Sequence, residues 1–428
     1  MAKKRKKTSE ERKLPIPEGF ITRMRSLLGE EETQLLVDAM DENPTVSIRI
    51  NRRKVTDVNS FISRFAEFGP SPVPWCASGF YLDRRPDFIL DPLLHAGTYY
   101  VQEAASMVYE SLVGFILDRL KSLADGRPIL AADLCAAPGG KSTAILNALD
   151  CNHILVANEI DRKRASILKE NLDKWGDPDV IITSSDTSKF AALTDLFDLV
   201  AVDAPCSGEG MMRREPIARS QWNPGLVNQC AALQSDILKN AVAALRPGGF
   251  LIYSTCTFND MENEGMVEEL ISKYDLELVP LDTIGNPRHF YPHRDRCEGL
   301  FTALFRKPEG PCNKSYAIHS PEDMVRILKK TGIYILSAGT EFTTAKGNLE
   351  IPSSRQVLAT DYDRERFPSV EVNLDEARAY LRRDSLRLPE GTPLGYVAIT
   401  YMGHPLGLVK NIGSRANNLY PSEWKIRS

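Results

Sequence analysis

The middle of the chain alternates short apolar runs with longer segments of helical period. Apolar runs of strand length occupy residues 129–135, 153–159, 180–183, 198–203 and 250–255. Apolar side chains recur at helical spacing over residues 141–149, 161–176 and 232–245. The segment at 246–249, RPGG, predicts the end of the last helix, and residues 299–307 predict one more strand near the sheet edge. Strands that alternate with helices predict a doubly wound, mostly parallel α/β sheet.

The regions on either side of this pattern differ from it. Residues 20–40 have a helical period, residues 45–51 alternate like a strand, and residues 100–120 predict a strong helix. Towards the C-terminus, a Pro/Gly-rich linker precedes short β runs and one helix. These later segments are the linker at 307–315, the β runs at 332–339 and 393–413, a turn at 403–405 and the helix at 374–386.

These patterns divide the chain into five segments. We expect a disordered basic tail, an N-terminal α+β domain, the alternating α/β domain, a linker, and a small α+β or β-barrel-like domain. Their expected bounds are, in the same order, residues 1–13, 14–125, 126–307, 308–320 and 321–428.

Composition is that of an ordinary soluble globular protein. Hydrophobic residues make up 43% of the chain and charged residues 26%. No apolar stretch reaches about 20 residues, the length of a membrane span, and the charged N-terminus has no apolar segment behind it. We therefore expect a cytoplasmic protein. None of the eight cysteines forms a CxxC pair, so we expect free thiols and no metal site.

The net charge of −4 argues against a strongly basic nucleic-acid-binding protein. Basic residues are nevertheless concentrated in the N-terminal part of the chain, at Lys3–Lys7, Arg23, Arg25, Arg49 and Arg52–Lys54. A charged run of this kind is typical of a solubilising arm. An arm that contacts phosphate groups is the alternative.

A glycine-rich turn, DLCAAPGGK at 133–141, joins the first of these strands to its helix. Its end matches a P-loop, but Cys135 stands where that motif requires its first glycine, and the turn is not GxGxxG. Glu159, Asp186 and Asp203 follow the next three strands, where carboxylates can bind a ribose and an adenine amine. Any one of these acids alone is typical of a helix N-cap. Together they predict a nucleoside site without a phosphate cradle, which fits S-adenosylmethionine.

Two cysteine motifs follow the fourth and fifth strands of the pattern, DAPC at 203–206 and YSTCTF at 253–258. C5 of a pyrimidine is too weak a nucleophile to take a methyl group directly, whereas a thiolate that adds at C6 makes C5 nucleophilic. Asp203 is placed to stabilise the charge that develops near N3, and release of the thiol needs a base. One of Cys206 and Cys256 therefore attacks and the other assists release, but position alone leaves open which does which.

These motifs closely resemble those of the RsmB/NSUN-type RNA cytosine-C5 methyltransferases. The segments that carry the resemblance are 133–141, 158–161, 203–214, 253–258 and 292–307, together with 47–55 and 97–107 in the N-terminal part. The insertion at 208–224 and the tail at 407–424 resemble the family's bacterial small-subunit rRNA methyltransferase F branch. The resemblance implies a Rossmann-like S-adenosylmethionine-dependent methyltransferase fold. It also implies an N-terminal RNA-binding domain and a C-terminal PUA-like RNA-binding domain.

The resemblance also implies roles for individual residues. Cys256 is the attacking thiol, Cys206 assists release, Asp203 contacts the base as well as the cofactor, and Lys141 lies near the active site. Glu103 stands where family members often carry Asp. Cofactor contacts are implied for Cys135, Ala136, Ala137, Pro138, Gly139, Gly140, Lys141, Glu159, Asp186 and Asp203.

A cytosine in structured RNA must be flipped out of its stack to reach such a thiol. The side chains that we expect to hold the strand are aromatic residues and arginines, namely Tyr99, Tyr100, Arg213, Arg214 and Trp222. In the C-terminal domain, Lys410 and Arg415 have no acidic neighbours in the sequence and predict a further RNA contact.

The function that we expect is formation of 5-methylcytosine in rRNA, 16S rRNA in particular, by a monomer. Methylation of tRNA is one alternative, since it uses the same chemistry. A non-catalytic RNA-binding ribosome assembly factor is another, but the intact cysteine motifs argue against it. The missing GxGxxG argues against an NAD-dependent dehydrogenase.

Overall fold

The structure is a computed structural model of the chain, and it describes residues 14–339, 343–346 and 349–427. The expected disordered tail at 1–13 lies outside the described residues. Within the described part, no helix is both long enough and apolar enough to cross a membrane.

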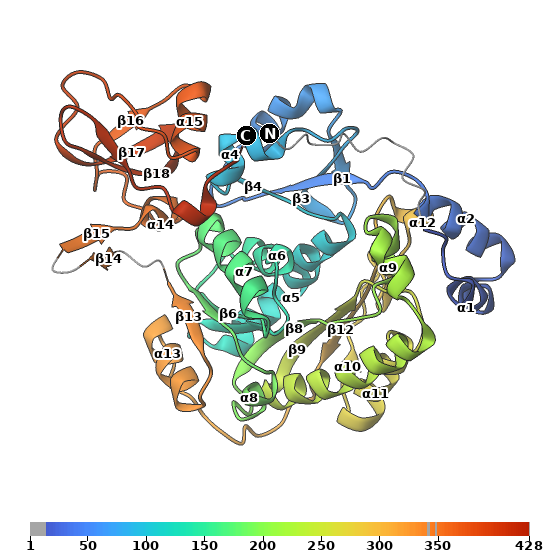
Figure 1. The fold of residues 1–428 in the computed structure, drawn as a ribbon. Coiled ribbons are helices and arrows are strands. Elements are labelled where there is room, and N and C mark those ends of the chain that lie inside the picture. The colour runs from blue at the N-terminus through green and yellow to red at the C-terminus, as the bar shows by residue number, and fades with distance from the viewer. Residues whose placement is uncertain (1–13, 340–342, 347–348, 428) are drawn as a thin grey trace.

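Nine of the described strands form the central sheet, in the order β10-β12-β9-β8-β5-β6-β7-β13 with β11 beside β12 (Figure 1). Strands β9, β8, β5, β6 and β7 are parallel, whereas β12 and β13 run antiparallel to them on either side. The bounds are β5 Ile129–Asp133, β6 His153–Asn158, β7 Val180–Thr183, β8 Phe197–Asp203, β9 Leu245–Thr255, β10 Glu277–Leu278, β11 Arg288–Phe290, β12 Leu300–Arg306 and β13 Ile335–Ala338. The predicted doubly wound, mostly parallel sheet is confirmed.

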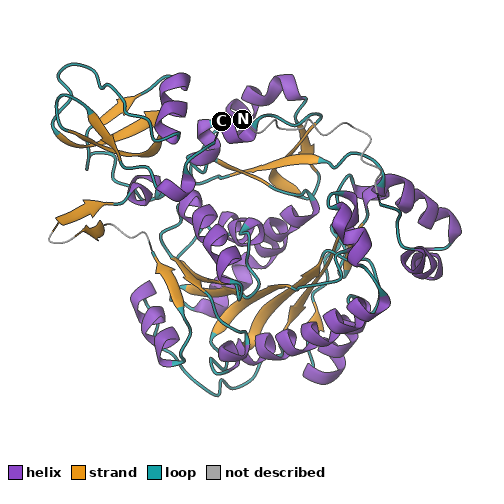
Figure 2. Ribbon diagram, in the orientation of Figure 1, coloured by secondary structure: helices purple, strands orange, loops and turns teal. Residues whose placement is uncertain are grey.

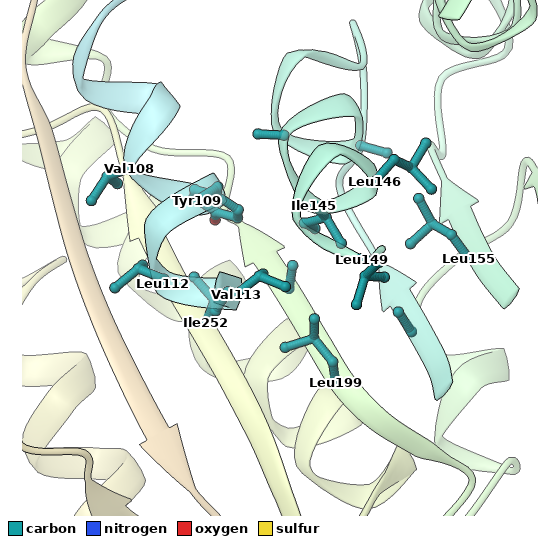
Figure 3. Close-up of a cluster of buried hydrophobic side chains, with 14 of the residues drawn as sticks. Val108, Tyr109, Leu112, Val113, Ile145, Leu146, Leu149, Leu155, Leu199 and Ile252 are labelled. Atoms are coloured by element: carbon teal, nitrogen blue, oxygen red, sulfur yellow. The ribbon is translucent and has the colours of Figure 1, made fainter. Parts of the chain in front are cut away.

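Helices cover both faces of this sheet (Figure 2). One face carries α5 Val108–Ala124, α6 Gly140–Ala148 and α7 Arg162–Trp175, and the other carries α8 Ser188–Ala191, α10 Pro224–Ala244, α11 Glu264–Tyr274 and α13 Pro321–Lys330. Along β8, Leu199 packs in the first layer and Val200 in the second, because successive strand residues point to opposite faces. Figure 3 shows the first layer, where Leu112 of α5 and Ile145 of α6 meet Leu199. Burial on both faces explains why these strands read as continuous apolar runs.

Two of the predicted helices begin or break differently in the structure. The helical period at 20–40 is two helices, α1 Glu18–Leu28 and α2 Glu30–Met40, separated at Gly29, whose φ of 84° suits glycine. The helix predicted from residue 100 begins only at Val108, because Tyr99–Val101 is strand β4 and Ala105–Met107 is a 3₁₀ turn. The pairing of β4 with β1 overrides the helical period there.

The predicted end of the helix before Arg246-Pro-Gly-Gly249 is confirmed to within one residue. Helix α10 ends at Ala244, and the chain is already extended at Leu245, where β9 begins. The strand therefore starts five residues earlier than the predicted one at 250–255. The two glycines lie in an irregular stretch of β9, between the Leu245 and Phe250 pairings with β8.

The N-terminal domain is a small antiparallel sheet in the order β2-β3-β1-β4, which lies beyond α5–α7 as seen from the central sheet (Figure 1). Its remaining elements are β1 Val46–Ile50, α3 Val58–Ile62, η1 Ser63–Phe68, β2 Ser71–Val73, β3 Cys76–Leu82, η2 Phe88–Leu90 and α4 Pro92–His95. The strand predicted at 45–51 is confirmed as β1.

The expected solubilising arm is wrong for Arg49, Arg53 and Lys54, as is its phosphate-contacting alternative, because these side chains bond to the protein interior. Arg53 donates to the carbonyl of Leu149 at the end of α6, and Lys54 Nζ donates to the carbonyl of Lys174 near the end of α7 (2.6 Å). Cations at helix C-termini satisfy free carbonyls and interact favourably with the helix dipole. These residues attach the N-terminal domain to the catalytic helices.

The C-terminal domain is a four-stranded sheet in the order β16-β17-β18-β19, beside helix α15. Its elements are β14 Thr343–Lys346, β15 Leu349–Pro352, α14 Ser354–Leu358, β16 Ser369–Glu371, α15 Leu374–Leu381, β17 Gly395–Tyr401, β18 His404–Asn411, β19 Ala416–Asn418 and η5 Ser422–Trp424. Its apolar residues, Tyr380 and Val397 among them, share one core with Ile48 and Tyr99 of the N-terminal domain. The two flanking domains are therefore packed together.

One segment assigned to the C-terminal domain by sequence belongs to the central sheet. Strand β13 pairs antiparallel with β7, and α13 packs on the same layer as α8 and α10. The β run predicted at 332–339 is present, but its partner is β7. We therefore propose that the catalytic domain extends to about residue 338 and that the C-terminal domain begins after it.

Arg49 offers a test of how the N-terminal domain is attached. It is fully buried, donates from Nε to Gln102 Oε1 (2.7 Å) and from Nη2 to Thr143 Oγ1 (2.5 Å), and lies 3.9 Å from a Glu110 carboxylate oxygen. Because Arg49→Ala leaves that carboxylate buried without its cation, we expect the free energy of unfolding to fall by roughly 3 kcal/mol in urea titrations. The matched control is Arg25→Ala on α1, whose ion pair with Glu30 is exposed. Equal effects of the two substitutions would contradict this account.

Candidate active site

The two cysteine motifs meet because their strands are neighbours in the sheet. Asp203 at the end of β8 pairs with Ser254 near the end of β9, so the loops that follow start side by side. The Sγ atoms of Cys206 and Cys256 lie 3.1 Å apart, and both side chains are half-buried. The structure thus brings together two thiols that are 50 residues apart in the sequence.

The surroundings of Cys206 favour its protonated form. The hydrogen bond with Cys256 and then burial raise the pKa of Cys206 well above its usual value, and the nearby carboxylates of Glu262 and Asp203 act in the same direction. Cys206 therefore keeps its proton near neutral pH. A thiol that keeps its proton is a weak nucleophile and a proton carrier.

Lys141 and Asp203 form an ion pair beside the thiols. Lys141 Nζ lies 2.9 Å from Asp203 Oδ2, and Ser254 Oγ donates to Asp203 Oδ1 (2.7 Å). Burial alone would lower the pKa of Lys141, but Asp203 outweighs it, with smaller contributions from Cys256 and Glu103, and the pKa is raised. The ammonium group stays charged, and the carboxylate is held in one orientation.

The glycine-rich turn after β5 is tightly built. Gly139 has φ 111°, and a Cβ there would meet Leu168 Cδ1 of α7 at 3.3 Å. Ser142 Oγ donates to Asp133 Oδ2 (2.6 Å), while Asp133 Oδ1 is buried and receives no hydrogen bond from the described residues. Burial raises the pKa of Asp133 to about 7. Cys135, Ala136, Ala137, Pro138 and Gly139 form the turn after β5, and Gly140 and Lys141 begin α6.

The predicted acids lie at the carboxyl ends of consecutive strands. Glu159 follows β6 and is buried; its Oε2 receives no hydrogen bond, although Arg164 Nη1 is 3.2 Å away. Asp186 follows β7, is exposed, and accepts from the backbone N–H of Ser188 (2.9 Å). A buried carboxylate oxygen without a donor, beside a glycine turn without a phosphate cradle, suits the hydroxyl groups of a nucleoside. The residues present fit S-adenosylmethionine.

Two buried glutamates that sequence reasoning missed connect the thiol loops. Glu209, from the loop after Cys206, accepts from the backbone N–H groups of Phe258 (2.7 Å) and Asn259 (2.9 Å) just after Cys256. Glu262 Oε2, from the loop after Cys256, accepts from the backbone N–H of Ser207 (3.0 Å). Both glutamates are fully buried, so each carboxylate fixes the backbone of the opposite loop.

A signal for these glutamates exists in the sequence. They lie three residues after Cys206 and six after Cys256, and Asn259 between them donates to both carboxylates, at 3.2 Å to Glu209 and 2.7 Å to Glu262. Acids this close to two reactive cysteines could have been singled out. Their direction towards each other's loop depends on the tertiary structure.

Several residues predicted to hold RNA are instead structural. Tyr99 is buried and donates to Asp91, and Trp222 is buried and donates from Nε1 to Glu209 Oε1. Arg213 is 8% exposed and donates to the carbonyls of Asn43 and Cys297. These predictions are wrong because the insertion that contains Arg213 and Trp222 packs against the N-terminal helices.

The remaining RNA candidates are accessible to different degrees. Arg214 is exposed and lines a cavity of about 550 Å³ together with Glu103 and Glu298. Tyr100 is half-buried, and its hydroxyl accepts from Asn171. Lys410 and Arg415 are exposed on the C-terminal domain. Glu103, which stands where family members often carry Asp, accepts from the backbone N–H of Glu298 (3.1 Å).

The N-terminal helices cover the insertion that follows Cys206. This insertion contains the 3₁₀ helix η4 Glu209–Arg213 and helix α9 Pro216–Gln221. Arg219 of α9 is buried and donates to the carbonyls of Met212, Leu14 and Met40. Helices α1 and α2 are thereby fixed over the loops that carry the two thiols.

A doubly wound sheet with this glycine turn, acids at three successive strand ends and a lysine–aspartate pair defines the class of S-adenosylmethionine-dependent methyltransferases. Solved structures agree with this class. A methyltransferase homologue from Pyrococcus horikoshii is 28% identical, with a TM-score of 0.58, over 68% of this chain and 95% of that chain. NSun6 from the same organism, solved with SFG, shares the fold with a TM-score of 0.57 at 20% identity, over 69% of this chain and 99% of that chain.

Sequence comparisons identify the particular family. Residues 122–306 match the family described as 16S rRNA methyltransferase RsmB/F, residues 16–104 match the RsmF N-terminal domain, and residues 367–426 match the RsmF PUA domain. Proteins named ribosomal RNA small subunit methyltransferase F are 31% identical in Salmonella newport (95% of this chain, 96% of that protein) and 30% in an Enterobacter species (95% of each). The chain belongs to the RsmB/F family of 16S rRNA methyltransferases.

Glu262 offers a test of how the thiols are positioned. In Glu262→Gln an NH₂ group replaces one carboxylate oxygen. This group cannot accept the hydrogen bonds that Ser207 N, Gln234 Nε2 and Asn259 Nδ2 donate to the carboxylate, so one or more of them is lost. Because a shift of about 1 Å at a catalytic group costs up to about 100-fold in rate, we expect single-turnover methyl transfer to slow at least about tenfold. Cofactor affinity, measured by calorimetry, should be retained. The control is Glu268→Gln on the exposed face of α11; a wild-type rate in Glu262→Gln would contradict the positioning role.

Proposed function

We propose that this chain forms 5-methylcytosine in 16S rRNA by a covalent mechanism in which Cys256 attacks C6 of the base. The observation that carries this proposal is the 3.1 Å contact between Cys206 and Cys256 beside the Lys141–Asp203 pair. A methyltransferase that modified an exocyclic amine would have no use for two adjacent thiols. A transient bond to the ring needs one thiol to form it and benefits from a second group that assists its release.

In the covalent step, Cys256 gives its proton to solvent, and its sulfur forms a bond to C6 while the electron pair of the C5=C6 double bond moves towards C5. A proton that Asp203 delivers to N3 neutralises the charge delocalised there, and Lys141 and Ser254 maintain the orientation of Asp203. C5 then forms a bond to the methyl group, and the electron pair of the broken sulfur–methyl bond stays on the donor's sulfur. Loss of the C5 proton to a base, with return of the N3 proton to Asp203, re-forms C5=C6 and expels the Cys256 sulfur.

Cys206 is assigned to release because of its raised pKa. It holds a proton near neutral pH and shares a hydrogen bond with Cys256, so it can return a proton to the departing sulfur. A thiol that holds its proton is a poor attacking group. This argument from charge and burial agrees with the roles that the motifs imply.

The cofactor residues proposed from sequence are retained. Residues 135–141 would contact the donor, Glu159 would accept from the ribose with the carboxylate oxygen that receives no hydrogen bond, and Asp186 would accept from an adenine amine. Asp203, paired with Lys141 of the same segment, would contact both the donor and the base. When bound, S-adenosylmethionine supplies the methyl group.

The substrate follows from the relatives. The proteins that align over 95% of this chain are named for the small ribosomal subunit RNA. Residues 367–426 match a PUA domain, in which we expect RNA contacts. We propose that a monomer without bound metal acts on 16S rRNA in the cytoplasm, within the assembling or assembled subunit.

Substitution of the cysteines tests their roles. Cys256→Ala removes the attacking sulfur, so it should abolish methylation and leave S-adenosylmethionine binding unchanged. Cys206→Ala removes the release group, so it should accumulate a protein–RNA adduct that survives denaturing gel electrophoresis. Cys312→Ala, at an exposed cysteine in the segment after β12, is the control. A reversed pattern, with the adduct in Cys256→Ala, would overturn the assignment.

Bisulfite mapping tests the substrate. In a strain that lacks this gene, at least one cytosine of 16S rRNA should lose its protection from bisulfite conversion, and the wild-type gene should restore it. The Cys256→Ala gene should not. Loss of protection in tRNA with unchanged 16S rRNA would establish the tRNA alternative.

A further inference from the structure

A large groove lies where the N-terminal domain meets the edge of the central sheet. Its volume is about 1100 Å³, and its walls come from the β2–β3 turn, β3, α5, β11 and the segment after α12 Pro292–Asp295. No residue proposed above for the thiol or cofactor chemistry lines it. The groove is therefore a separate surface from the reaction site.

Aromatic side chains form much of this surface. The rings of Trp75 and Phe290 pack against each other with centroids 4.8 Å apart, and Trp75 is half-buried. Phe115 lies on the solvent-facing side of α5 and is 47% exposed. Exposed aromatic rings in a groove are platforms on which unpaired bases stack.

The charge of the groove is positive. Its charged lining residues are Arg288, Arg294, Asp295 and Arg296. Asp295 is paired with Arg288 (2.8 Å) and Arg294 with Glu32 (2.6 Å), whereas Arg296 forms no ion pair with any described carboxylate. Arg296 is exposed, with its guanidinium 4.5 Å from the Tyr81 ring centroid. An unpaired arginine stacked on an aromatic ring suits a polyanion with planar bases.

The groove is connected to the reaction site by a short segment. Arg296 is only three residues before Gly299, roughly 10 Å at full extension. A Cβ on Gly210 would meet the carbonyl of Glu298 at 3.0 Å, and the N–H of Gly210 donates to the carbonyl of Cys256 (2.9 Å). The groove wall at Arg296 is therefore only a short length of chain from the backbone that contacts the Cys256 loop.

Glu103 contacts the same segment. It accepts from the backbone N–H of Glu298 (3.1 Å), two residues after Arg296. The chain between the groove wall and the Cys256 loop is therefore held in place by this carboxylate.

We propose that this aromatic and arginine-lined groove binds the single-stranded RNA that flanks the target cytosine, with bases on Trp75 and Phe115 and a phosphate at Arg296. The inference rests on the proposed function, since it assigns a path to the same substrate. It gives the enzyme a stacking contact outside the pocket that holds the flipped base.

Tryptophan fluorescence of the full chain tests the proposal. Trp175, Trp222 and Trp424 are at most 6% exposed, so Trp75 is the tryptophan that stacking bases can reach. Titration with a short unstructured RNA that contains one cytosine should quench the emission, and Trp75→Phe should remove that quenching. Phe115→Ala and Arg296→Ala should each weaken binding about tenfold, and Arg296→Ala should lower the salt slope by about 0.7.

Matched controls are Ile271→Ala on α11, where the side chain is 41% exposed, and Arg326→Ala on α13. Both should bind RNA like the wild type. An RNA adduct in Cys206→Ala without tryptophan quenching would overturn the groove assignment and leave the proposed function intact. Absence of both adduct and quenching would contradict the proposed function itself. Unchanged RNA affinity in Phe115→Ala and Arg296→Ala would also overturn the assignment, in favour of a protein segment as the occupant.

Discussion

The structure of the reaction site depends on two buried carboxylates that cross between neighbouring loops. Glu209 binds the backbone after Cys256, and Glu262 binds the backbone after Cys206. Charged hydrogen bonds in a fully buried position are strong, and a missing partner is costly, so neither loop can move without the other. This mutual attachment explains how two thiols on separate strands remain 3.1 Å apart.

The flanking segments are attached to the catalytic domain by buried and partly buried basic side chains. Arg49, Arg53 and Lys54 connect the N-terminal domain to α6 and α7, and Arg219 fixes α1 and α2 over the insertion. The N-terminal and C-terminal domains share one core. Arg49, Arg53, Lys54 and Arg213, which suggested contact with RNA, therefore hold the domains together, whereas Arg214, Lys410 and Arg415 remain exposed.

Much of the fold could be predicted from sequence because the central strands are buried on both faces. A strand such as β8 packs against helices on both faces and is therefore apolar along most of its length. Such a continuous apolar run can be recognised in the sequence without knowing the fold. Prediction failed where pairing with a distant strand decided the conformation. Tyr99–Val101 is extended because β1 lies beside it, and β13 joins β7 across about 150 residues of chain.

The sequence by itself determined the chemistry. Packing cannot create a thiol, a carboxylate or a glycine where the sequence lacks one. The sequence therefore decides that Cys206, Cys256, the acids at the strand ends and the glycines of the turn are present. The tertiary structure decided which side chains reach that chemistry. Glu209 and Glu262 are fixed on the thiol loops, whereas Tyr99, Arg213 and Trp222 are buried away from any substrate. The reason is physical: a motif fixes which groups are present, but direction and burial depend on contacts between segments far apart in the chain.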